Sequence, residues 1–182
     1  MNTMKKGFTL IELLIVIALL GVLAVALLAA LDPLEQIKKG TDTGVRNTVT
    51  EIGSSLTRYA SVKAGMFPFT GTIPFGTIGT TPGNPMYDAI QEVIDAGELK
   101  ADFFTLAKDQ LNQIYVTAVN NAGTQKAFVC FQPSAKSFRV DPNTKFGTLA
   151  GTSGVMTELT GCDASGMGTG TAGTQACYWC VQ

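Results

Sequence analysis

Four cysteines carry the most reactive side chains in this chain. Cys130, Cys162, Cys177 and Cys180 form an even set, which in an oxidising compartment favours two disulfides. Cys177 and Cys180 have the spacing of a zinc-binding pair, but Cys130 and Cys162 are too far apart to form a second such pair. A thioredoxin-like redox pair normally opens a helix after a strand, whereas Cys180 is followed here by two residues. We therefore favour disulfides over a zinc site or a redox motif.

The spacing of the cysteines also limits how they can pair. Cys177 and Cys180 are three residues apart, so in a strand they point to opposite faces and do not bond each other. Cys130–Cys180 with Cys162–Cys177 fits best, because it ties the last strand to the sheet and closes a loop. Cys130–Cys177 with Cys162–Cys180 is a close second, since it differs only in which face of the last strand meets Cys130.

Glu12 is the one charged residue in an apolar run from Phe8 to Leu31. As a helix, such a run covers about 36 Å, which is enough to cross a hydrocarbon core of roughly 30 Å. A carboxylate facing lipid at the centre of a span costs on the order of 2.5–3.5 kcal/mol, and less near its edge. Glu12 therefore predicts a partner that arrives when several chains assemble.

Enzymatic chemistry finds little support in the sequence. Histidine is absent, which excludes histidine-based acid–base catalysis and histidine metal ligands. No nucleophile elbow or phosphate loop is present. Asp88, Glu92 and Asp95 are better explained as a solvated helix face than as paired carboxylates or a calcium site. Tyr178 and Trp179 are better explained as packed aromatics than as a ligand-stacking pair. We expect no catalytic residues, no bound metal and no cofactor.

Lys5 and Lys6 precede the apolar run and predict its orientation. Positive charge next to a span stays on the cytoplasmic side, so the rest of the chain is exported. A secretory signal peptide would have a shorter apolar core and a small-residue cleavage site after it. Leu31, Asp32 and Pro33 form a poor cleavage site, so we expect the run to be retained in the mature protein.

The segment Gly7-Phe8-Thr9-Leu10-Ile11-Glu12-Leu13-Leu14-Ile15-Val16-Ile17 resembles the processing site of type IV prepilins and the related pseudopilins. The resemblance covers roughly a fifth of the chain at most. It implies cleavage between Gly7 and Phe8 by a prepilin peptidase, and methylation of the new amine of Phe8. It also implies that Glu12 meets the N-terminal amine of a neighbouring subunit during filament assembly. The alternative is a plain signal anchor in which the glutamate has no role.

The chain divides into four expected parts. Residues 1–7 form the leader and residues 8–31 the membrane-spanning helix. Residues 32–64 continue as an amphipathic helix, interrupted near Asp32 and Pro33 because proline lacks an N–H group. Residues 65–182 form the exported head. The amphipathic part has apolar residues at helical spacing, which predicts one buried stripe: Leu34, Ile37, Val45, Val49, Ile52, Leu56 and Tyr59.

Within the head we expect an antiparallel sheet covered by this stripe, which makes the fold class α+β and pilin-like. Residues 66–84 have no periodicity and predict a loop, whereas Asn84 and Pro85 predict a short helix over 85–96. Strands are expected at 114–119, 127–131, 137–140 and 176–181. The Gly- and Thr-rich residues 147–174 predict a long surface loop.

These expectations favour a structural subunit that polymerises through its N-terminal helix. The precursor would lie in the inner membrane with its C-terminal part exported, and the assembled protein would be an extracellular filament. Loss of Lys5 and Lys6 with the leader changes the net charge from −1 to −3, which gives no broad surface for nucleic acid. One alternative is a pseudopilin of a type II secretion system, although the major members usually carry a calcium site near the C-terminus. Another is a minor, tip-located binding subunit.

Overall fold

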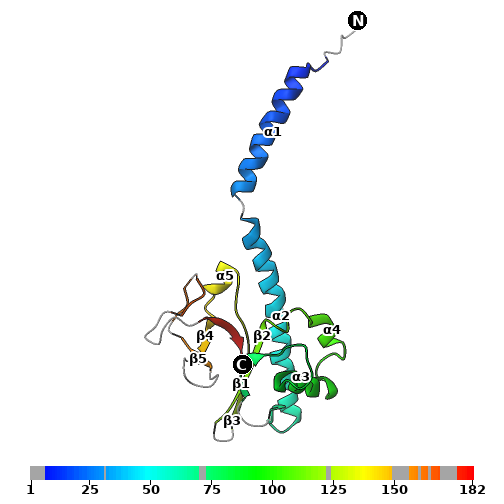
Figure 1. The fold of residues 1–182 in the computed structure, drawn as a ribbon, viewed down its shortest axis with the longest axis vertical. Coiled ribbons are helices and arrows are strands. Elements are labelled where there is room, and N and C mark those ends of the chain that lie inside the picture. The colour runs from blue at the N-terminus through cyan, green and yellow to red at the C-terminus, as the bar shows by residue number, and fades with distance from the viewer. Residues whose placement is uncertain are drawn as a thin grey trace. The chain divides into compact units, whose positions relative to one another are not determined.

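The computed structural model describes residues 7–30, 32–69, 73–121, 124–148, 156–159, 161–163, 165–168 and 176–182. Residues 1–6, Leu31, residues 70–72 and 122–123 and most of 149–175 lie outside the described residues. The chain forms two compact units, Met1–Ile37 and Lys38–Gln182. The first contains the apolar helix, and the second, which we call the head, contains the sheet (Figure 1).

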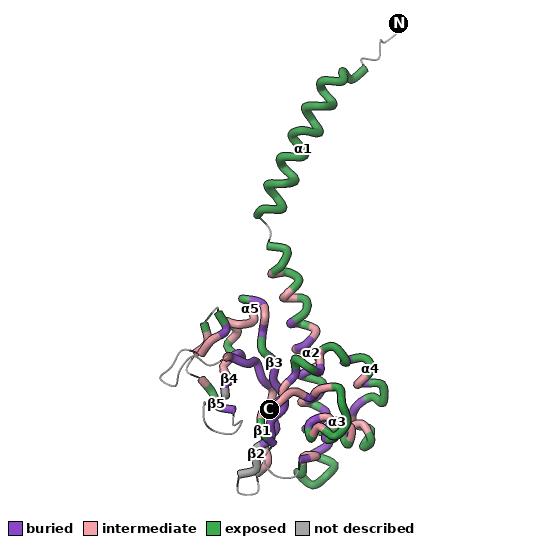
Figure 2. The backbone as a smooth tube through the Cα atoms, in the orientation of Figure 1, coloured by how far each residue is buried: buried purple, intermediate pink, exposed green. Residues whose placement is uncertain are grey.

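Helix α1 (Leu10–Ala30) is apolar throughout, and none of its residues is buried (Figure 2). Among the described residues it is the one helix that is long and apolar enough to cross a membrane, with a mean hydropathy of 3.2. Its length of 21 residues corresponds to about 32 Å, close to the thickness of a hydrocarbon core. The apolar run therefore forms the helix that its composition predicts.

Helix α2 (Pro33–Val62) begins at the proline that was expected to interrupt the apolar run. Asp32 caps its first turn, because its Oδ1 accepts a hydrogen bond of 3.2 Å from the backbone N–H of Glu35. The helix ends two residues before the expected position, and Ala64 and Gly65 follow with positive φ angles. The interruption at Asp32 and Pro33 is therefore a capped restart.

The apolar stripe of α2 divides at the boundary between the two units. Its five residues in the head are all buried, whereas Leu34 and Ile37 in the first unit are exposed. The buried five pack into the main core of the head: Val45, Val49, Ile52, Leu56 and Tyr59. The stripe predicted from spacing is thus correct for the head alone.

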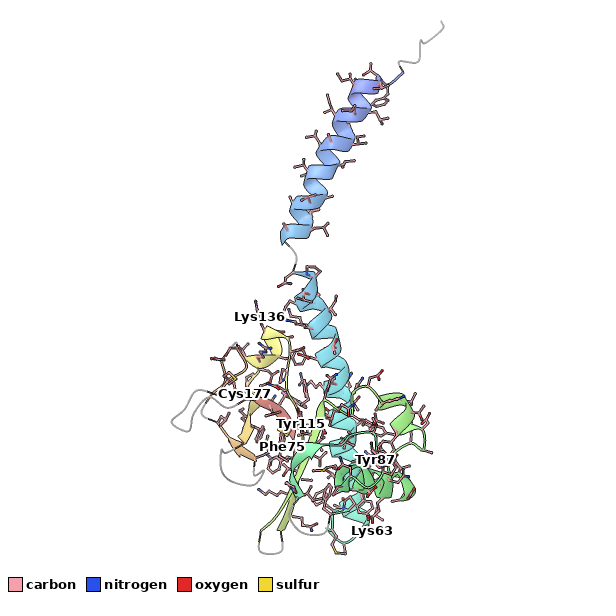
Figure 3. All side chains as sticks on the ribbon, in the orientation of Figure 1. Lys63, Phe75, Tyr87, Tyr115, Lys136 and Cys177 are labelled. Atoms are coloured by element: carbon pink, nitrogen blue, oxygen red, sulfur yellow. A yellow bond between two sulfur atoms is a disulfide. The ribbon has the colours of Figure 1, made fainter. Side chains whose placement is uncertain are left out.

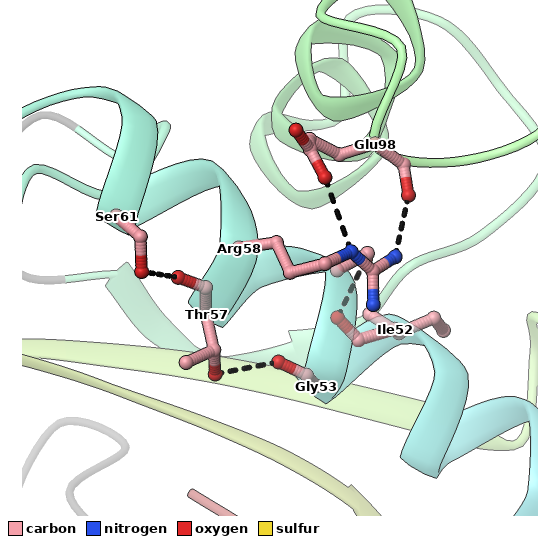
Figure 4. A network of polar contacts seen from close by, with 7 residues as sticks. Ile52, Gly53, Thr57, Arg58, Ser61 and Glu98 are labelled. Carbon is pink, nitrogen blue, oxygen red and sulfur yellow. Dashed lines mark hydrogen bonds and ion pairs between the residues drawn. The ribbon is translucent and has the colours of Figure 1, made fainter.

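Two shorter helices pack into the same core. Helix α3 (Pro85–Asp95) is capped by Asn84, whose side chain accepts a hydrogen bond of 3.0 Å from the N–H of Met86. Helix α4 (Phe103–Ala107) buries Phe103 and Ala107. Arg58 of α2 fastens the connection between them: its Nε donates to the Glu98 carboxylate and its Nη2 to the Glu98 carbonyl, at 3.1 and 2.7 Å (Figure 4).

Within the described residues, the sheet has six antiparallel strands in the order β1-β2-β3-β6-β4-β5. Strands β2 (Ile114–Asn121) and β3 (Thr124–Phe131) form a long hairpin. Strand β6 (Tyr178–Val181) is the last in chain order, yet it lies between β3 and β4 (Thr144–Thr148). The edges are β1 (Ile73–Thr77) and β5 (Met156–Glu158).

Alternation along the strands builds two separate apolar clusters. Ile114, Val116 and Phe131 belong to the main core beneath α2, α3 and α4. Tyr115, Cys130 and Tyr178 belong to a second cluster, on the other face of the sheet. There Phe75 stacks on Tyr115 with ring centroids 4.7 Å apart. The expected α+β class, with a helix packed on an antiparallel sheet, is confirmed.

The loop expected at 66–84 is wrong in part, because it contains strand β1. Ile73 faces the main core and Phe75, two residues on, joins the second cluster, so the side chains do not alternate regularly across the register shift between Ile73 and Gly76. Pro74 and Gly76 also usually argue against a strand, so the sequence offered no pattern of period two. Proline is tolerated here because β1 is an edge strand.

The strand expected at 137–140 is also wrong, because residues 136–139 form the short helix α5 (Lys136–Arg139). Its start is fixed by a distant residue: the buried Asp42 of α2 accepts hydrogen bonds from the N–H groups of Ser134 and Ala135, at 2.9 and 2.7 Å. Such a tertiary contact leaves no local pattern. Strands β4 and β5 likewise shorten the surface loop expected at 147–174.

Candidate assembly site

Thr9 and Glu12 form a compact polar group at the start of α1, next to the exposed Phe8. Thr9 precedes the first helical residue, and its Oγ1 accepts a hydrogen bond of 3.3 Å from the N–H of Glu12. In return, Oε2 of Glu12 accepts hydrogen bonds from both the N–H and the hydroxyl of Thr9, each 2.8 Å long. This reciprocal arrangement is a capping box, which satisfies backbone groups that a helix start leaves unpaired.

The sequence analysis singled out Glu12 and did not assign a role to Thr9. The spacing Thr-x-x-Glu before an apolar run was the signal that could have found it. Gly7 and Phe8 precede the helix and are exposed, Phe8 with 88% of its surface accessible. The peptide bond between Gly7 and Phe8 therefore lies outside regular structure, and the side chain of Glu12 lies one turn away from it.

The four cysteines form two disulfides, Cys130–Cys180 and Cys162–Cys177. This is the pairing that side-chain alternation favoured. Cys130 and Cys180 face each other directly across β3 and β6, with Cα atoms 4.1 Å apart. Because all four sulfurs are joined, none is available as a thiolate for zinc. Nor does any group of three acidic, cysteine or histidine side chains that could hold a metal occur within the described ranges.

The three acidic residues of α3 each contact a different partner. Glu92 accepts a short hydrogen bond from the hydroxyl of Tyr59, whereas Asp95 is bonded by Gln91 and Asp88 by the N–H of Gly83. The hydrogen bond to Glu92 is the main cause that raises the pKa of Tyr59 to about 12, and desolvation adds to it. These contacts join α2 to α3 and do not bring two carboxylates together.

Tyr178 and Trp179 do not form a stacking pair. They point to opposite faces of β6, Tyr178 into the second cluster and Trp179 into the main core. Burial raises the pKa of the Tyr178 hydroxyl. Arg46 of α2 lies over the indole of Trp179, with its guanidinium carbon 4.7 Å from the ring centroid. Both rings therefore serve packing.

Comparison with known families gives one match. Residues 2–28 match the model of the prokaryotic N-terminal methylation motif, which includes Gly7, Phe8, Thr9 and Glu12. No curated protein matches the chain, and no solved structure matches it. The match rests on residues 2–9 and most of α1, whereas the head is described by its own structure alone.

Proposed function

We propose that this member of the type IV pilin and pseudopilin family, marked by its N-terminal methylation motif, is a structural subunit that polymerises into a type IV pilus-like filament. The single observation that carries the proposal is an apolar helix, exposed along its length, that begins with one carboxylate within the methylation motif. The precursor would lie in the inner membrane, and the filament would be extracellular.

Assembly would bury the apolar side chains of α1, which are exposed in the single chain. Each large apolar side chain removed from water contributes about 1.5–3 kcal/mol, but these side chains lie in lipid before assembly, so transfer into a bundle is close to neutral. Close packing of helices and satisfaction of polar groups then become the stronger terms. Small residues of α1 that permit close approach include Gly21, Ala24 and Ala26.

Processing would create the partner of Glu12. In the uncleaved chain the nitrogen of Phe8 belongs to a peptide bond and carries no charge. Cleavage after Gly7 by a prepilin peptidase, and methylation by the same class of enzyme, would turn it into a charged amine. A carboxylate and an amine in a water-poor environment form a strong, charge-assisted hydrogen bond. Glu12 of one subunit would then bond Phe8 of another and fix the register between their helices.

The proposal assigns a separate role to each part of the chain. Residues 1–7 would be removed, and residues 8–31 would form the filament core. Residues 32–64 would connect the core to the head, and residues 65–182 would supply the filament surface. The disulfides Cys130–Cys180 and Cys162–Cys177 would stabilise that surface in the oxidising space outside the cytoplasm.

Two variants of the precursor test the proposal. Glu12→Val should insert into the membrane at least as well as the parent, because a charge is removed from the span. It should nevertheless give few or no filaments. Leu14→Val is the matched control, because it alters the apolar surface of the same helix without touching a charge. Counting filaments by electron microscopy, with subunit levels measured by immunoblot, gives the readout.

Normal filament numbers from Glu12→Val, in cells without another subunit to supply the carboxylate, would refute the role of Glu12. A wild-type strain in which this protein is absent from every purified filament would refute the function itself. Replacing Gly7 by a bulky residue should leave the full-length precursor in the membrane, and mass spectrometry should find a mature wild-type chain that starts at Phe8.

A further inference from the structure

The head carries its charges unevenly. The segment from Pro85 to Gln110, which holds α3 and α4, has six acidic residues and two lysines, a net charge of 2 − 6 = −4. Five of the acidic residues are exposed. We call these five the acidic flank: Asp88, Glu92, Asp95, Asp102 and Asp109.

A basic flank lies around the start of α5. We define it by five cations of the head: Lys38, Lys39, Arg46, Lys136 and Arg139. Two acidic residues lie among them, so the net charge is 5 − 2 = +3. One of these, Asp42, is 3% exposed and binds Ser134 and Ala135, and the other, Asp141, lies 3.9 Å from Arg46.

Two sets of contacts hold α5 beside α2. The three hydrogen bonds from Ser134 and Ala135 to the Asp42 carboxylate fasten the start of α5. One turn further along α2, Arg46 lies over Phe138 of α5, with its guanidinium carbon 5.8 Å from the ring centroid. Lys38 and Lys39 precede Asp42 by one turn, so they share its side of the helix. The basic flank is therefore a fixed surface built from two elements.

The two flanks lie on opposite sides of α2. Figure 1 shows α5 on one side and α3 and α4 on the other, and Figure 3 shows Lys136 and Tyr87 in the same relation. Along the helix the two flanks overlap in part. Tyr59 bonds Glu92 of α3, 17 residues beyond Asp42, whereas Gln110, next to Asp109 of the acidic flank, accepts a hydrogen bond from Thr48, only six residues beyond Asp42. The head is thus polarised across α2.

We propose that the basic flank of one head binds the acidic flank of a second copy of this chain. The proposal deepens the filament function and rests on it. Chains inserted in one membrane with the same orientation are parallel, so a two-fold contact between antiparallel heads is not available to them. A contact between two different surfaces of parallel copies is head-to-tail, and such a contact continues from copy to copy. Opposite charges on opposite flanks are what this arrangement needs.

Charge complementarity would set direction and register more than strength. The head has 11 basic and 11 acidic residues, a net charge of 11 − 11 = 0, so the uneven placement of its charges decides how two heads attract or repel. Two like flanks repel each other, whereas two opposite flanks attract. Exposed pairs of this kind contribute modestly one by one and mainly steer association and exclude wrong alignments.

Charge reversal in the full-length precursor tests the contact. Lys38→Glu, Lys39→Glu and Lys136→Glu together change the basic flank from +3 to 3 − 6 = −3, and Asp95→Lys, Asp102→Lys and Asp109→Lys together change the segment that carries the acidic flank from −4 to 6 − 4 = +2. These residues avoid Asp42, Arg58 and Glu92, whose contacts hold the head together. Each triple variant should give about tenfold fewer filaments per unit of membrane subunit, because like charges then face each other. The variant that combines all six changes should recover filaments, because attraction is restored with the signs exchanged.

Lys126→Glu on β3 is the control for a change in charge outside both flanks, and it should leave filament numbers unchanged. Cysteine replacements give a second readout: cells that make Asp95→Cys together with Lys136→Cys should contain a disulfide-linked dimer of the two variants. Absence of that dimer, in cells whose filaments are normal, would overturn the contact.

The outcomes separate this inference from the filament function. Wild-type filaments with normal assembly of both triple variants would overturn the inference and leave the function standing. Loss of filaments in the basic triple variant without recovery in the variant that combines all six changes would also overturn it, and would assign the basic flank to another partner such as an anionic lipid surface. A wild-type chain that forms no filament at all would remove the function first.

Discussion

At the scale of single residues, close approach matters as much as polar contact. Gly53 lies where α2 crosses β6, and a Cβ at this position would lie 2.5 Å from Cγ2 of Val181. Atoms of two packed side chains do not come so close, so the side chain of Val181, the helix or the strand must shift. Glycine in a helix normally lowers stability, and here it is needed because of its neighbour.

Gly53→Ala should therefore lower the melting temperature of the detergent-solubilised protein, although alanine is the better helix former. Overpacking costs about 1–3 kcal/mol and exceeds the gain in helix propensity of about 1 kcal/mol. Gly44→Ala in the same helix is the control, because its Cβ would meet only Nε2 of Gln110 at 3.7 Å. Fluorescence of the single tryptophan, Trp179, reports unfolding of the head. Equal melting temperatures for the two variants would show that the close approach has no cost.

Tyr59 provides a prediction about pH. Its pKa is raised from 10.0 to about 12 in the folded protein, mainly by the hydrogen bond to Glu92. The unfolded chain therefore ionises first, so the stability that Tyr59 contributes is complete below pH 10 and is lost as the pH rises towards 12. Tyr59→Phe should be less stable than the wild type at pH 9, and this difference should shrink by pH 11.5. Denaturant unfolding at both values measures it, and a constant difference would contradict the assignment.

Single residues also show which features of the structure could be predicted from the sequence. Alternation of side chains along a strand was enough to reject a Cys177–Cys180 bond, because it depends only on spacing, whereas it left Cys130–Cys177 as a close second to Cys130–Cys180. Thr9 carried a readable signal in its distance from Glu12, yet the search for catalytic and assembly residues passed over it. Gly53 carried no signal at all, since its importance comes from Val181, which is 128 residues away in the chain.

At the scale of elements, the buried carboxylate of Asp42 fixes the conformation of a segment that is distant in the sequence. Ser134 and Ala135 donate three hydrogen bonds to it, one of them from the Ser134 hydroxyl at 2.7 Å. The segment that follows was expected to be a strand and is helix α5. Long, periodic elements such as α1, α2 and the β2–β3 hairpin were predictable because their pattern is local. Strand β1 and helix α5 were not, because a proline and a tertiary contact respectively override local preference.

Asp42→Ala should detach the start of α5 from α2. Three donors lose their acceptor, and each buried donor left without a partner costs about 1–3 kcal/mol. Hydrogen exchange should increase at residues 134–139, and the free energy of unfolding should fall. Ser134→Ala removes one of the three bonds and is the graded control. Unchanged exchange in Asp42→Ala would show that packing alone holds α5 in place.

At the scale of the whole molecule, two disulfides close loops of different length in the C-terminal part of the head. Cys130–Cys180 joins residues 50 apart, and Cys162–Cys177 joins residues 15 apart. Loop-closure entropy gives about 3 kcal/mol for a loop of 15 residues and about 4 kcal/mol for one of 50. The longer link should therefore contribute more, if the two are otherwise equal.

Paired replacement by alanine tests this order. Cys130→Ala with Cys180→Ala should lower the melting temperature more than Cys162→Ala with Cys177→Ala. Peptide mapping of the non-reduced wild type should recover a fragment that joins the region of residue 130 to the peptide with Cys180. A peptide in which Cys177 is joined to Cys130 would favour the alternative pairing.

The place of β6 has a consequence for the order of events during export. In the proposed export the N-terminus stays on the cytoplasmic side and the head crosses the membrane in chain order, so β1, β2 and β3 can pair before the later strands arrive. Strands β4 and β5 cannot join them, because β6 lies between β3 and β4 and follows both in the chain. The sheet therefore stays in two parts until translocation reaches residues 178–181. Any delay at this last step leaves the edges of β3 and β4 open to pairing with another chain, which makes late translocation the interval in which the head is most exposed to misassembly.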